Sequence, residues 1–372
     1  MRTYNWEIYF IFDKLLKLLL KKAKDHYYRN FFNAHKKASK KTWDKINDLI
    51  TNGKNRHSKF HLVKDENVVT DSLEIANIFN DYFLNIPVDL LSNLPRSTND
   101  YSNLIPYNTS SLFFTPTTHN EVYTIIKSIK SKSNIDDIPL KMLKLTPIFS
   151  VGIAGLFNHI ISTGLYPDQL KIATVIPIFK SGNRCDTKNY RPISLLPVLD
   201  KIFERLIIDR IMSFLIKNKI ISDRQFGFIS GSNTQLAIFD LLSAVVPALK
   251  DKEFAVAIFA DLSRAFDCVN TELLVQKLYA YGIRGLPSSL LKSFLTNRHQ
   301  LVKFDNAFSN LGHIEMGVPQ GSSLGPLLFL LYLNELPRLC NTNIKCILYA
   351  DDTTLVSRGS DLNLVSSYNG DV

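Results

Sequence analysis

The chain has 372 residues, 45% of them hydrophobic, and a mean hydropathy near zero, which is typical of a globular protein with a sizeable core. Its four cysteines, Cys185, Cys268, Cys340 and Cys346, show no Cys-x-x-Cys or His-paired spacing. This argues against a disulfide scaffold or a zinc knuckle and favours a reduced intracellular protein. The net charge of +10 lies entirely in residues 1–60, where 15 Lys or Arg stand against 5 Asp or Glu.

Residues 1–50 are predicted to be helical and basic. A basic arm on an otherwise neutral chain favours contact with a polyanion, because neutralised phosphates release counterions. A solvated helical face is the alternative. Residues 8–20 are apolar but carry Asp13, Lys14 and Lys17. This stretch is too short and too charged to span a bilayer and lacks the charge order of a secretory signal. We therefore expect an amphipathic helix and no stable membrane association, with a membrane-surface role as the alternative.

Helix and strand patterns interleave irregularly along the rest of the chain. Residues 71–86 form a helix candidate, with Asp71 as its cap and apolar residues at helical spacing. A stretch rich in Ser, Thr, Asn and Pro predicts a linker. The expected organisation is a basic helical N-terminal extension at 1–93, a linker at 94–119, a helical segment at 120–170 and a main domain at 171–372. Further helices are expected at 200–216, 234–248, 271–281 and 327–333, and strands at 173–179, 254–260, 300–304 and 344–356.

Acidic residues stand at two strand ends. The apolar run 254–260 predicts a buried strand that ends at Asp261. Tyr349 to Asp352 puts two adjacent carboxylates between runs rich in β-branched residues, a pattern that predicts the tip of a hairpin. Clustered carboxylates suit a divalent cation, which takes oxygen ligands and offsets their repulsion. An Asp-Asp pair in a solvated loop is the alternative, and the third acid favours the metal site.

The order of these motifs resembles that of reverse transcriptases, most closely those of jockey-type non-LTR retrotransposons. Asp261 to Asp267 is similar to the first palm motif of that family, Gly317 to Pro326 to the second, and Tyr349 to Asp352 to the third. Residues 175–182 and 189–194 are similar to its fingers. Shorter similarities occur at residues 41–43, 75–83, 225–228 and 297–300.

This resemblance implies an α+β fold of the right-hand polymerase type, with fingers and an antiparallel palm sheet backed by helices, after a mainly helical N-terminal extension. Residues 171–372 would then hold the fingers and the palm. Only 20 residues follow Asp352. The fourth palm motif and the thumb are therefore expected to be missing, and the chain to be a truncated fragment that extends primers poorly.

The resemblance also implies the chemistry of the acids. Asp261, Asp351 and Asp352 would be the catalytic residues and would hold two Mg²⁺ ions, for which Mn²⁺ could substitute. Asp261 and Asp351 would contribute most, since the second acid of the hairpin coordinates less directly in the family. Asp267 would be structural or orienting.

Five further residues are implied to bind the nucleotide. Phe266 would exclude a ribose 2′-hydroxyl, with a core aromatic as the alternative. Lys180 and Arg191 would contact the triphosphate, with ordinary surface charge as the alternative. Gln320 and Gly321 would lie against the template base and the nucleotide, since glycine permits a close approach.

The function implied is that of an RNA-directed DNA polymerase domain, with an RNA template, a DNA primer and dNTPs as partners. It would act in the cytoplasm and nucleus as part of an element ribonucleoprotein. The alternatives are a catalytically inactive RNA-binding remnant and a maturase-like protein of the same fold.

Overall fold

The computed structural model describes residues 6–36, 38, 41–43, 45–46, 60–64, 67–92, 105–129, 138–340, 342–363 and 365. Contacts divide the chain into two compact units, one ending at Phe60 and one beginning at His61. The strands are β1 Leu62–Lys64, β2 Asn67–Val69, β3 Ile172–Phe179, β4 Tyr190–Leu195, β5 Phe254–Asp261, β6 Arg298–Phe304, β7 Ala307–Phe308, β8 Gly312–Ile314, β9 Ile344–Tyr349 and β10 Asp352–Gly359. The helices are α1 Trp6–Ala34, α3 Ser72–Ser92, α4 His119–Ser128, α5 Leu140–Leu145, α6 Phe149–Thr163, α7 Val198–Lys217, α8 Thr234–Lys250, α9 Thr271–Ala280, α10 Leu286–Leu295, α11 Leu324–Tyr332 and α12 Leu336–Leu339, with short 3-10 turns at Asp168–Leu170 and Thr187–Asn189.

The first unit is dominated by α1, a single helix of 29 residues. It confirms the helical prediction for most of residues 1–50. Large apolar side chains along it, such as Phe12, Leu16 and Leu19, are exposed, and lysines are interspersed among them. Among the described residues, no helix combines the length and the apolar character needed to cross a membrane.

In the second unit, a five-stranded sheet is covered by α3. The strand order is β4-β3-β6-β7, with β8 paired to the other part of β6, and all pairs are antiparallel except β3 with β6. Helix α3 begins at the expected cap, where Oδ2 of Asp71 accepts a hydrogen bond from the N–H of Glu74 at 2.9 Å. It packs on β6, β7 and β8. Phe79, which is fully buried, meets Tyr190 of β4 edge-on at 4.9 Å between ring centroids.

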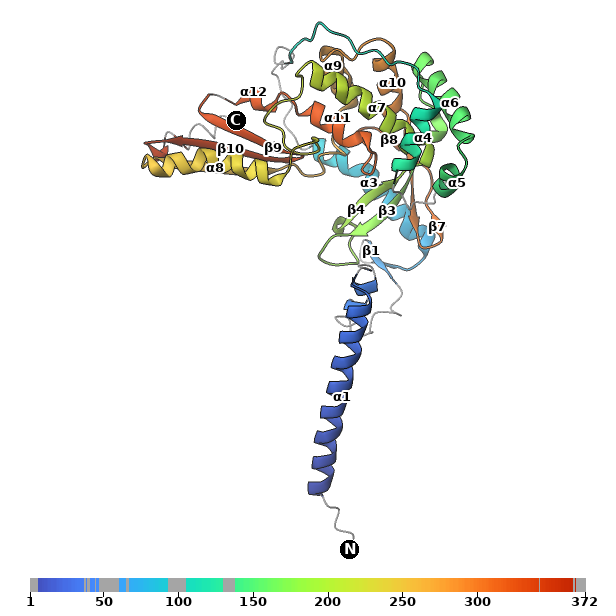
Figure 1. Cartoon of the computed structure of the whole chain (residues 1–372), viewed down its shortest axis with the longest axis vertical. Helices are drawn as coiled ribbons and strands as arrows, with labels where there is room; N and C mark the ends of the chain where they lie inside the picture. The colour runs from blue at the N-terminus through green and yellow to red at the C-terminus, as the bar shows by residue number, and fades with distance from the viewer. Residues whose placement is uncertain are drawn as a thin grey trace. The chain divides into compact units, whose positions relative to one another are not determined.

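The main hydrophobic core lies among the helices α4, α6, α7, α9, α10 and α11 (Figure 1). Helix α7 is central because apolar residues recur on it at helical spacing, and Ile202, Leu206 and Ile211 are almost completely buried. The aromatic rings of Phe203 on α7 and Phe157 on α6 meet at 5.0 Å between centroids. The helices predicted at 200–216, 234–248, 271–281 and 327–333 are confirmed within a few residues at their ends.

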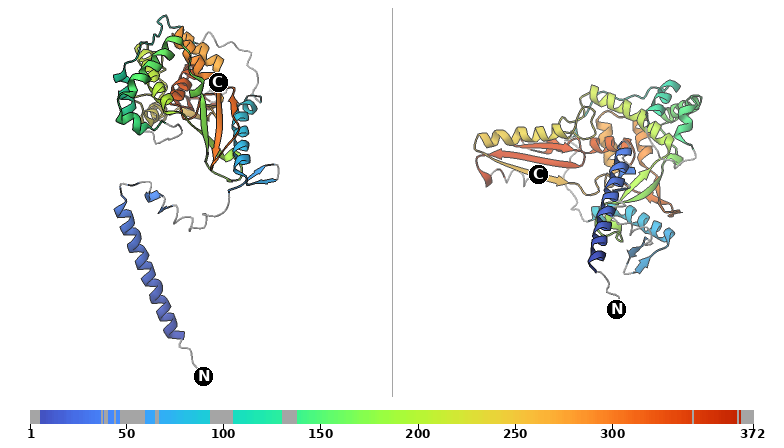
Figure 2. Two further views of the ribbon diagram at one scale, coloured as in Figure 1. Left: turned by 90° about the vertical axis from the view of Figure 1, so that its right-hand side faces the viewer. Right: turned by 60° about the horizontal axis from the view of Figure 1, so that its bottom comes forward.

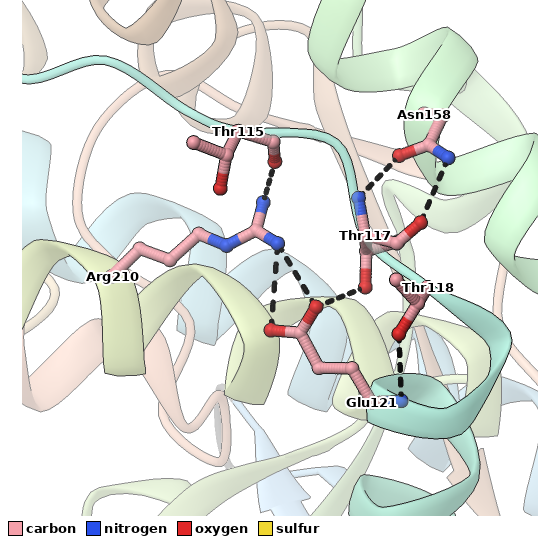
Figure 3. Close-up of polar contacts among 6 residues, drawn as sticks. All are labelled: Thr115, Thr117, Thr118, Glu121, Asn158 and Arg210. Carbon is pink, nitrogen blue, oxygen red and sulfur yellow. Dashed lines mark hydrogen bonds and ion pairs between the residues drawn. The ribbon is translucent and has the colours of Figure 1, made fainter.

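Polar contacts hold the segment before α4 against this helical core (Figure 3). The N–H of Thr117 donates to Oδ1 of Asn158 at 2.6 Å, and Nδ2 of Asn158 donates to the carbonyl of Thr117 at 3.0 Å. Arg210 of α7 donates to the carbonyl of Thr115 and pairs with Glu121 of α4 at 3.1 Å. Of the linker predicted at 94–119, residues 94–104 lie outside the described residues.

A separate three-stranded sheet has the order β5-β10-β9, with every pair antiparallel. Helix α8 lies along it, as Figure 1 and the right-hand view of Figure 2 show. The strand expected to be buried, β5, is largely exposed, and the side chain of Phe259 is 70% accessible. That prediction was wrong because the described elements packed on β5, mainly β10 and α8, leave most of its side chains accessible. An apolar run shows that a strand can be buried, whereas the elements packed on it decide whether it is.

The combination of helices with mostly antiparallel sheets confirms the α+β class. Strands 173–179, 254–260, 300–304 and the 344–356 hairpin were also predicted at the right places. In the described residues all four cysteines are free thiols.

Candidate active site

The third motif forms the tip of a hairpin, as the sequence predicts. Strands β9 and β10 pair with Tyr349 opposite Asp352, which leaves Ala350 and Asp351 as a two-residue loop. Ala350 has a φ of 59°, in the left-handed region. A positive φ at the first loop position is what a type II′ hairpin turn requires. The tight turn therefore keeps both aspartates at the end of the sheet.

Asp261 lies at the same end of the sheet. It is the last residue of β5 and pairs directly with Asp352, the first residue of β10. Directly opposed residues of antiparallel strands project to the same face, so these two carboxylates are neighbours. Asp351 precedes Asp352 in the loop. The structure thus brings the three predicted acids to one sheet end, although it pairs Asp352, rather than Asp351, with Asp261.

The charges of the three aspartates interact. Desolvation raises the pKa of Asp352, and the negative charges of Asp351 and Asp261 raise it further. Repulsion of this kind is what a divalent cation relieves. Within the described ranges, however, no three or more His, Cys, Asp or Glu side chains are gathered tightly enough to form a preformed metal cage.

An open pocket of about 410 Å³ adjoins this sheet end. Asp261 and Asp352 line it together with Tyr349, and α8 contributes an apolar wall through Ile238 and Leu241. Asp261 and Asp352 therefore stand at the edge of a concave surface that is open to solvent.

The segment Gln225 to Gly227 fixes the hairpin tip. Oε1 of Gln225 accepts hydrogen bonds from the N–H groups of Gly227 at 2.7 Å and Ala350 at 3.1 Å. The N–H of Phe226 donates to the carbonyl of Leu348 at 2.8 Å. A Cβ on Gly227 would lie 2.3 Å from the nitrogen of Ala350, so glycine is needed for this approach. Sequence reasoning noted the segment only for its resemblance and gave it no role.

The second motif joins the first motif to strand β4. Nε2 of Gln320 donates to Oδ2 of Asp267 at 2.7 Å, and the carbonyl of Gln320 accepts from the N–H of Ser194 at 2.7 Å. Gly321 has a φ of 127°, and a Cβ there would lie 2.1 Å from the carbonyl oxygen of Ser194. Glycine therefore lets the turn touch the backbone of β4, while Gln320 links it to the first motif.

Phe266 lies between the helical core and the second motif. Its ring stacks on Phe329 of α11 at 4.6 Å between centroids and meets Phe228 edge-on at 6.4 Å. Its carbonyl accepts a hydrogen bond from the N–H of Val318 at 2.8 Å. The ring is half-buried. Its part in choosing between sugars stays a prediction.

Lys180 and Arg191 lie on the β3–β4 hairpin. Arg191 is opposite Ile178, and Lys180 follows Ile178 by two residues, so strand alternation puts both cations on one face of the hairpin. Both side chains are exposed. Their hairpin reaches the second motif through Ser194 of β4. A role in binding phosphate remains a prediction.

One set of residues next to this site escaped sequence reasoning. Asp200 and Glu204 of α7 are fully buried, and Glu204 contacts the second motif through Ser322 and Ser323. The available signal was two carboxylates, four residues apart, on the apolar face of a predicted helix.

Comparison with known proteins agrees with this arrangement. The family described as "Reverse transcriptase (RNA-dependent DNA polymerase)" matches residues 178–366, more than half of the chain. The chain belongs to the reverse transcriptase family. The match includes the end of β3, strand β4 and the three motifs that contain Asp261, Gln320 and Asp352.

The similar proteins come from non-LTR transposons. Over 234 residues, 61% of its length, this chain is 36% identical to a probable RNA-directed DNA polymerase from transposon BS of Drosophila melanogaster. Over 270 residues, 69% of this chain, it is 32% identical to the RNA-directed DNA polymerase from mobile element jockey of the same fly. The matches span only 25% and 29% of those two proteins.

Proposed function

We propose that this chain carries an RNA-directed DNA polymerase domain, which adds deoxynucleotides to the 3′-hydroxyl of a DNA primer on an RNA template. The observation that carries the proposal is the cross-strand pair of Asp261 and Asp352 beside Asp351 at one end of an antiparallel sheet. Membership of the reverse transcriptase family supports it. In this proposal the β5-β10-β9 sheet belongs to the palm and the β3–β4 hairpin to the fingers.

Asp261, Asp351 and Asp352 are the proposed metal-binding residues. Their oxygen donors suit a hard cation. Desolvation raises the pKa of Asp352, and the charges of Asp351 and Asp261 raise it further, so a cation here would neutralise a local excess of negative charge. Two Mg²⁺ ions, or Mn²⁺ in their place, would supply activation of the primer hydroxyl and neutralisation of the leaving pyrophosphate. The hydrogen bond from Ala350 to Gln225 and the pairing of β10 with β5 hold Asp351 and Asp352 beside Asp261. Cation binding would therefore require little rearrangement of these carboxylates.

The incoming nucleotide is proposed to lie between the β3–β4 hairpin and the β9–β10 hairpin. Lys180 and Arg191 would neutralise its phosphate oxygens, because both cations are exposed on one face of the β3–β4 hairpin. Gln320 and Gly321 would form the surface against which the nucleotide and the template base pack. Phe266 would reject a ribose 2′-hydroxyl by overlap.

The nucleic acid is proposed to be bound partly through residues 1–60, which hold the whole net charge of the chain. Cationic side chains there would neutralise backbone phosphates without reading sequence. The proposed setting is an element ribonucleoprotein in the cytoplasm and nucleus.

The test is primer extension by the 372-residue chain on an RNA template with a DNA primer, dNTPs and Mg²⁺. Asp261→Asn and Asp352→Asn should each lower the rate by about a hundredfold or more, since metal-assisted charge stabilisation is worth several kcal/mol. Asp361→Asn, which changes an exposed aspartate, is the matched control and should keep the wild-type rate.

Extension that survives Asp261→Asn would refute the assignment of the acids. A wild-type chain that binds the RNA–DNA duplex but does not add even a single nucleotide to the primer would favour the second candidate, a non-catalytic RNA-binding remnant or a maturase-like protein.

A further inference from the structure

Three ionisable side chains are buried beneath the second motif. Asp200 and Glu204 of α7 have no exposed surface, and Arg298 at the start of β6 is only 1% exposed. Burying charged groups is costly unless partners compensate them. The partners of these three residues therefore indicate which part of the fold depends on them.

Glu204 is bonded to the turn that follows Gln320 and Gly321. One of its carboxylate oxygens accepts a hydrogen bond from the hydroxyl of Ser322, and the other accepts from the N–H of Ser323 at 2.7 Å. Both oxygens of the Glu204 side chain therefore act as acceptors toward this turn. Both bonds end on consecutive residues, so Glu204 restrains the direction of the backbone at this turn.

Ser322 also connects this turn to helix α11 by hydrogen bonds. Its hydroxyl oxygen accepts hydrogen bonds from the N–H of Leu324 at 3.0 Å and of Gly325 at 2.9 Å. These are N–H groups of the first turn of α11, which have no partner within the helix. A continuous chain of hydrogen bonds therefore runs from α7 through Ser322 to the start of α11.

The same turn also makes the contacts of the candidate site. Gln320 donates to Asp267 and accepts from Ser194, and Gly321 touches the backbone of β4. Ser322, to which Glu204 is bonded, directly follows Gly321 and lies two positions after Gln320. Glu204 is thus bonded to a residue next to the proposed nucleotide-binding surface. It contacts neither the acids nor the exposed cations.

Arg298 compensates the two buried carboxylates at longer range. Its Nη1 donates to the carbonyl of Phe294 at 2.9 Å, while its Nε and Nη2 have no hydrogen-bond partner among the described residues. The pKa of Glu204 is raised to about 8, mainly by burial and also by the charge of Asp200, against the opposing effects of the bonds from Ser322 and Ser323 and the charge of Arg298. The hydroxyl of Tyr166 donates to Asp200.

We propose that Glu204 is a positioning residue for nucleotide binding, which acts through Ser322 and Ser323 to hold Gln320 and Gly321 in place. This inference rests on the proposed function. A carboxylate that only stabilised the core would not change nucleotide affinity selectively. The distinguishing quantity is therefore the affinity for dNTP, measured separately from duplex affinity and from folding stability.

The experiment uses the full chain bound to an RNA template with a dideoxy-terminated DNA primer, titrated with the next complementary dNTP in Mg²⁺. No chemistry is needed for this measurement. Glu204→Ala should weaken dNTP binding about tenfold or more, as expected for loss of two buried hydrogen bonds, and leave duplex affinity nearly unchanged. Hydrogen exchange at Ser323 to Gly325 should become faster. Glu204→Gln, which keeps one acceptor, should be intermediate.

Two further variants keep the result interpretable. Asp209→Asn removes an exposed carboxylate from the same helix and should change neither dNTP binding nor exchange. Ser322→Ala removes the hydroxyl that bonds to Glu204 and changes the side-chain volume little. It is measured in place of Glu204→Ala if that variant fails to fold. Ser322→Ala should also weaken dNTP binding and leave duplex affinity nearly unchanged.

Unchanged dNTP affinity in Glu204→Ala, or in Ser322→Ala where the former does not fold, would overturn the inference, whether or not exchange becomes faster. An equal loss of duplex and dNTP affinity would also overturn it, since that pattern indicates a general structural role. A wild-type chain that binds the duplex but no dNTP would overturn the proposed function itself, and this inference with it.

Discussion

Asp267, a partly buried residue, illustrates how one side chain couples the site to stability. Its carboxylate accepts a hydrogen bond from Gln320. Its pKa is raised to about 6, because desolvation outweighs the opposing effects of the bond from Gln320 and the positive charge of Arg264. Asp267 therefore keeps its proton to a higher pH in the folded chain than an aspartate in the unfolded chain does.

The pH dependence of stability should report this residue. Because the pKa of Asp267 is higher in the folded chain, its contribution to the free energy of unfolding is fully present below about pH 4 and is lost as pH rises through about 6. Asp267→Asn should reduce the loss of stability between those values by on the order of 2 kcal/mol. Urea unfolding at stepped pH measures this. Asp305→Asn, at an exposed site, is the control, and an unchanged slope in Asp267→Asn would contradict the prediction.

Phe266 should affect both sugar selectivity and packing, and the two effects can be separated. Phe266→Val should raise the use of ribonucleotides relative to deoxynucleotides, because the smaller side chain leaves room for a 2′-hydroxyl. It should also cost about 1–3 kcal/mol of stability, because Val cannot stack on Phe329. Phe329→Leu removes the same ring stacking from the other side and should destabilise without altering selectivity. The same ribonucleotide ratio in Phe266→Val and the wild type would mean that the ring is a core aromatic.

At the scale of elements, the β9–β10 hairpin is held by a segment that is distant in sequence. Oε1 of Gln225 accepts a hydrogen bond from the N–H of Ala350. Gly227 lies so close to the same loop that a side chain at this position would clash with it. The position of the acids therefore depends on the docking of this segment as well as on β-sheet pairing.

Gly227→Ala should displace the hairpin. A Cβ at this position meets backbone rather than a flexible side chain, so we expect a loss of about 1–3 kcal/mol in the free energy of unfolding. Faster hydrogen exchange at Ala350 should accompany it. Gly152→Ala on α6 is the matched control, because a Cβ there has no neighbour within 4 Å. Equal stability of the two variants would show that the hairpin tip tolerates the displacement.

At the scale of the whole molecule, charge is distributed unevenly. Residues 1–60 carry +10, and the remainder of the chain sums to zero. The helix α1 within this arm presents both lysines and exposed apolar side chains. Salt dependence can show whether the lysines act on nucleic acid.

The basic arm should make RNA binding sensitive to salt but insensitive to sequence. For each phosphate that the arm no longer neutralises, the slope of log affinity against log salt should become shallower by about 0.7–0.9. Replacing Lys14, Lys17, Lys21, Lys22 and Lys24 by Gln in the full chain should therefore flatten the slope. Replacing Lys141, Lys217 and Lys292, three lysines outside the arm, serves as the control. The same slope in the arm variant and the wild type would exclude this role.

Local patterns predicted most elements correctly. Helical spacing of apolar residues located α7, and Asp71 marked the start of α3 because a cap depends only on groups a few residues apart. The adjacent acids predicted the β9–β10 turn for the same reason. Burial was less predictable, as β5 shows: the described elements packed on it leave most of its side chains accessible.

The sequence by itself determined the order of the motifs, the family they resemble and the residue types available for metal and phosphate. Only the tertiary structure decided that Asp352 stands opposite Asp261 and that Glu204 is buried against Ser322. The physical reason is that strand register and helix packing depend on free energies of interaction between segments far apart in the chain. A local pattern specifies what a segment can form, and the packing of the whole domain specifies which side chains meet.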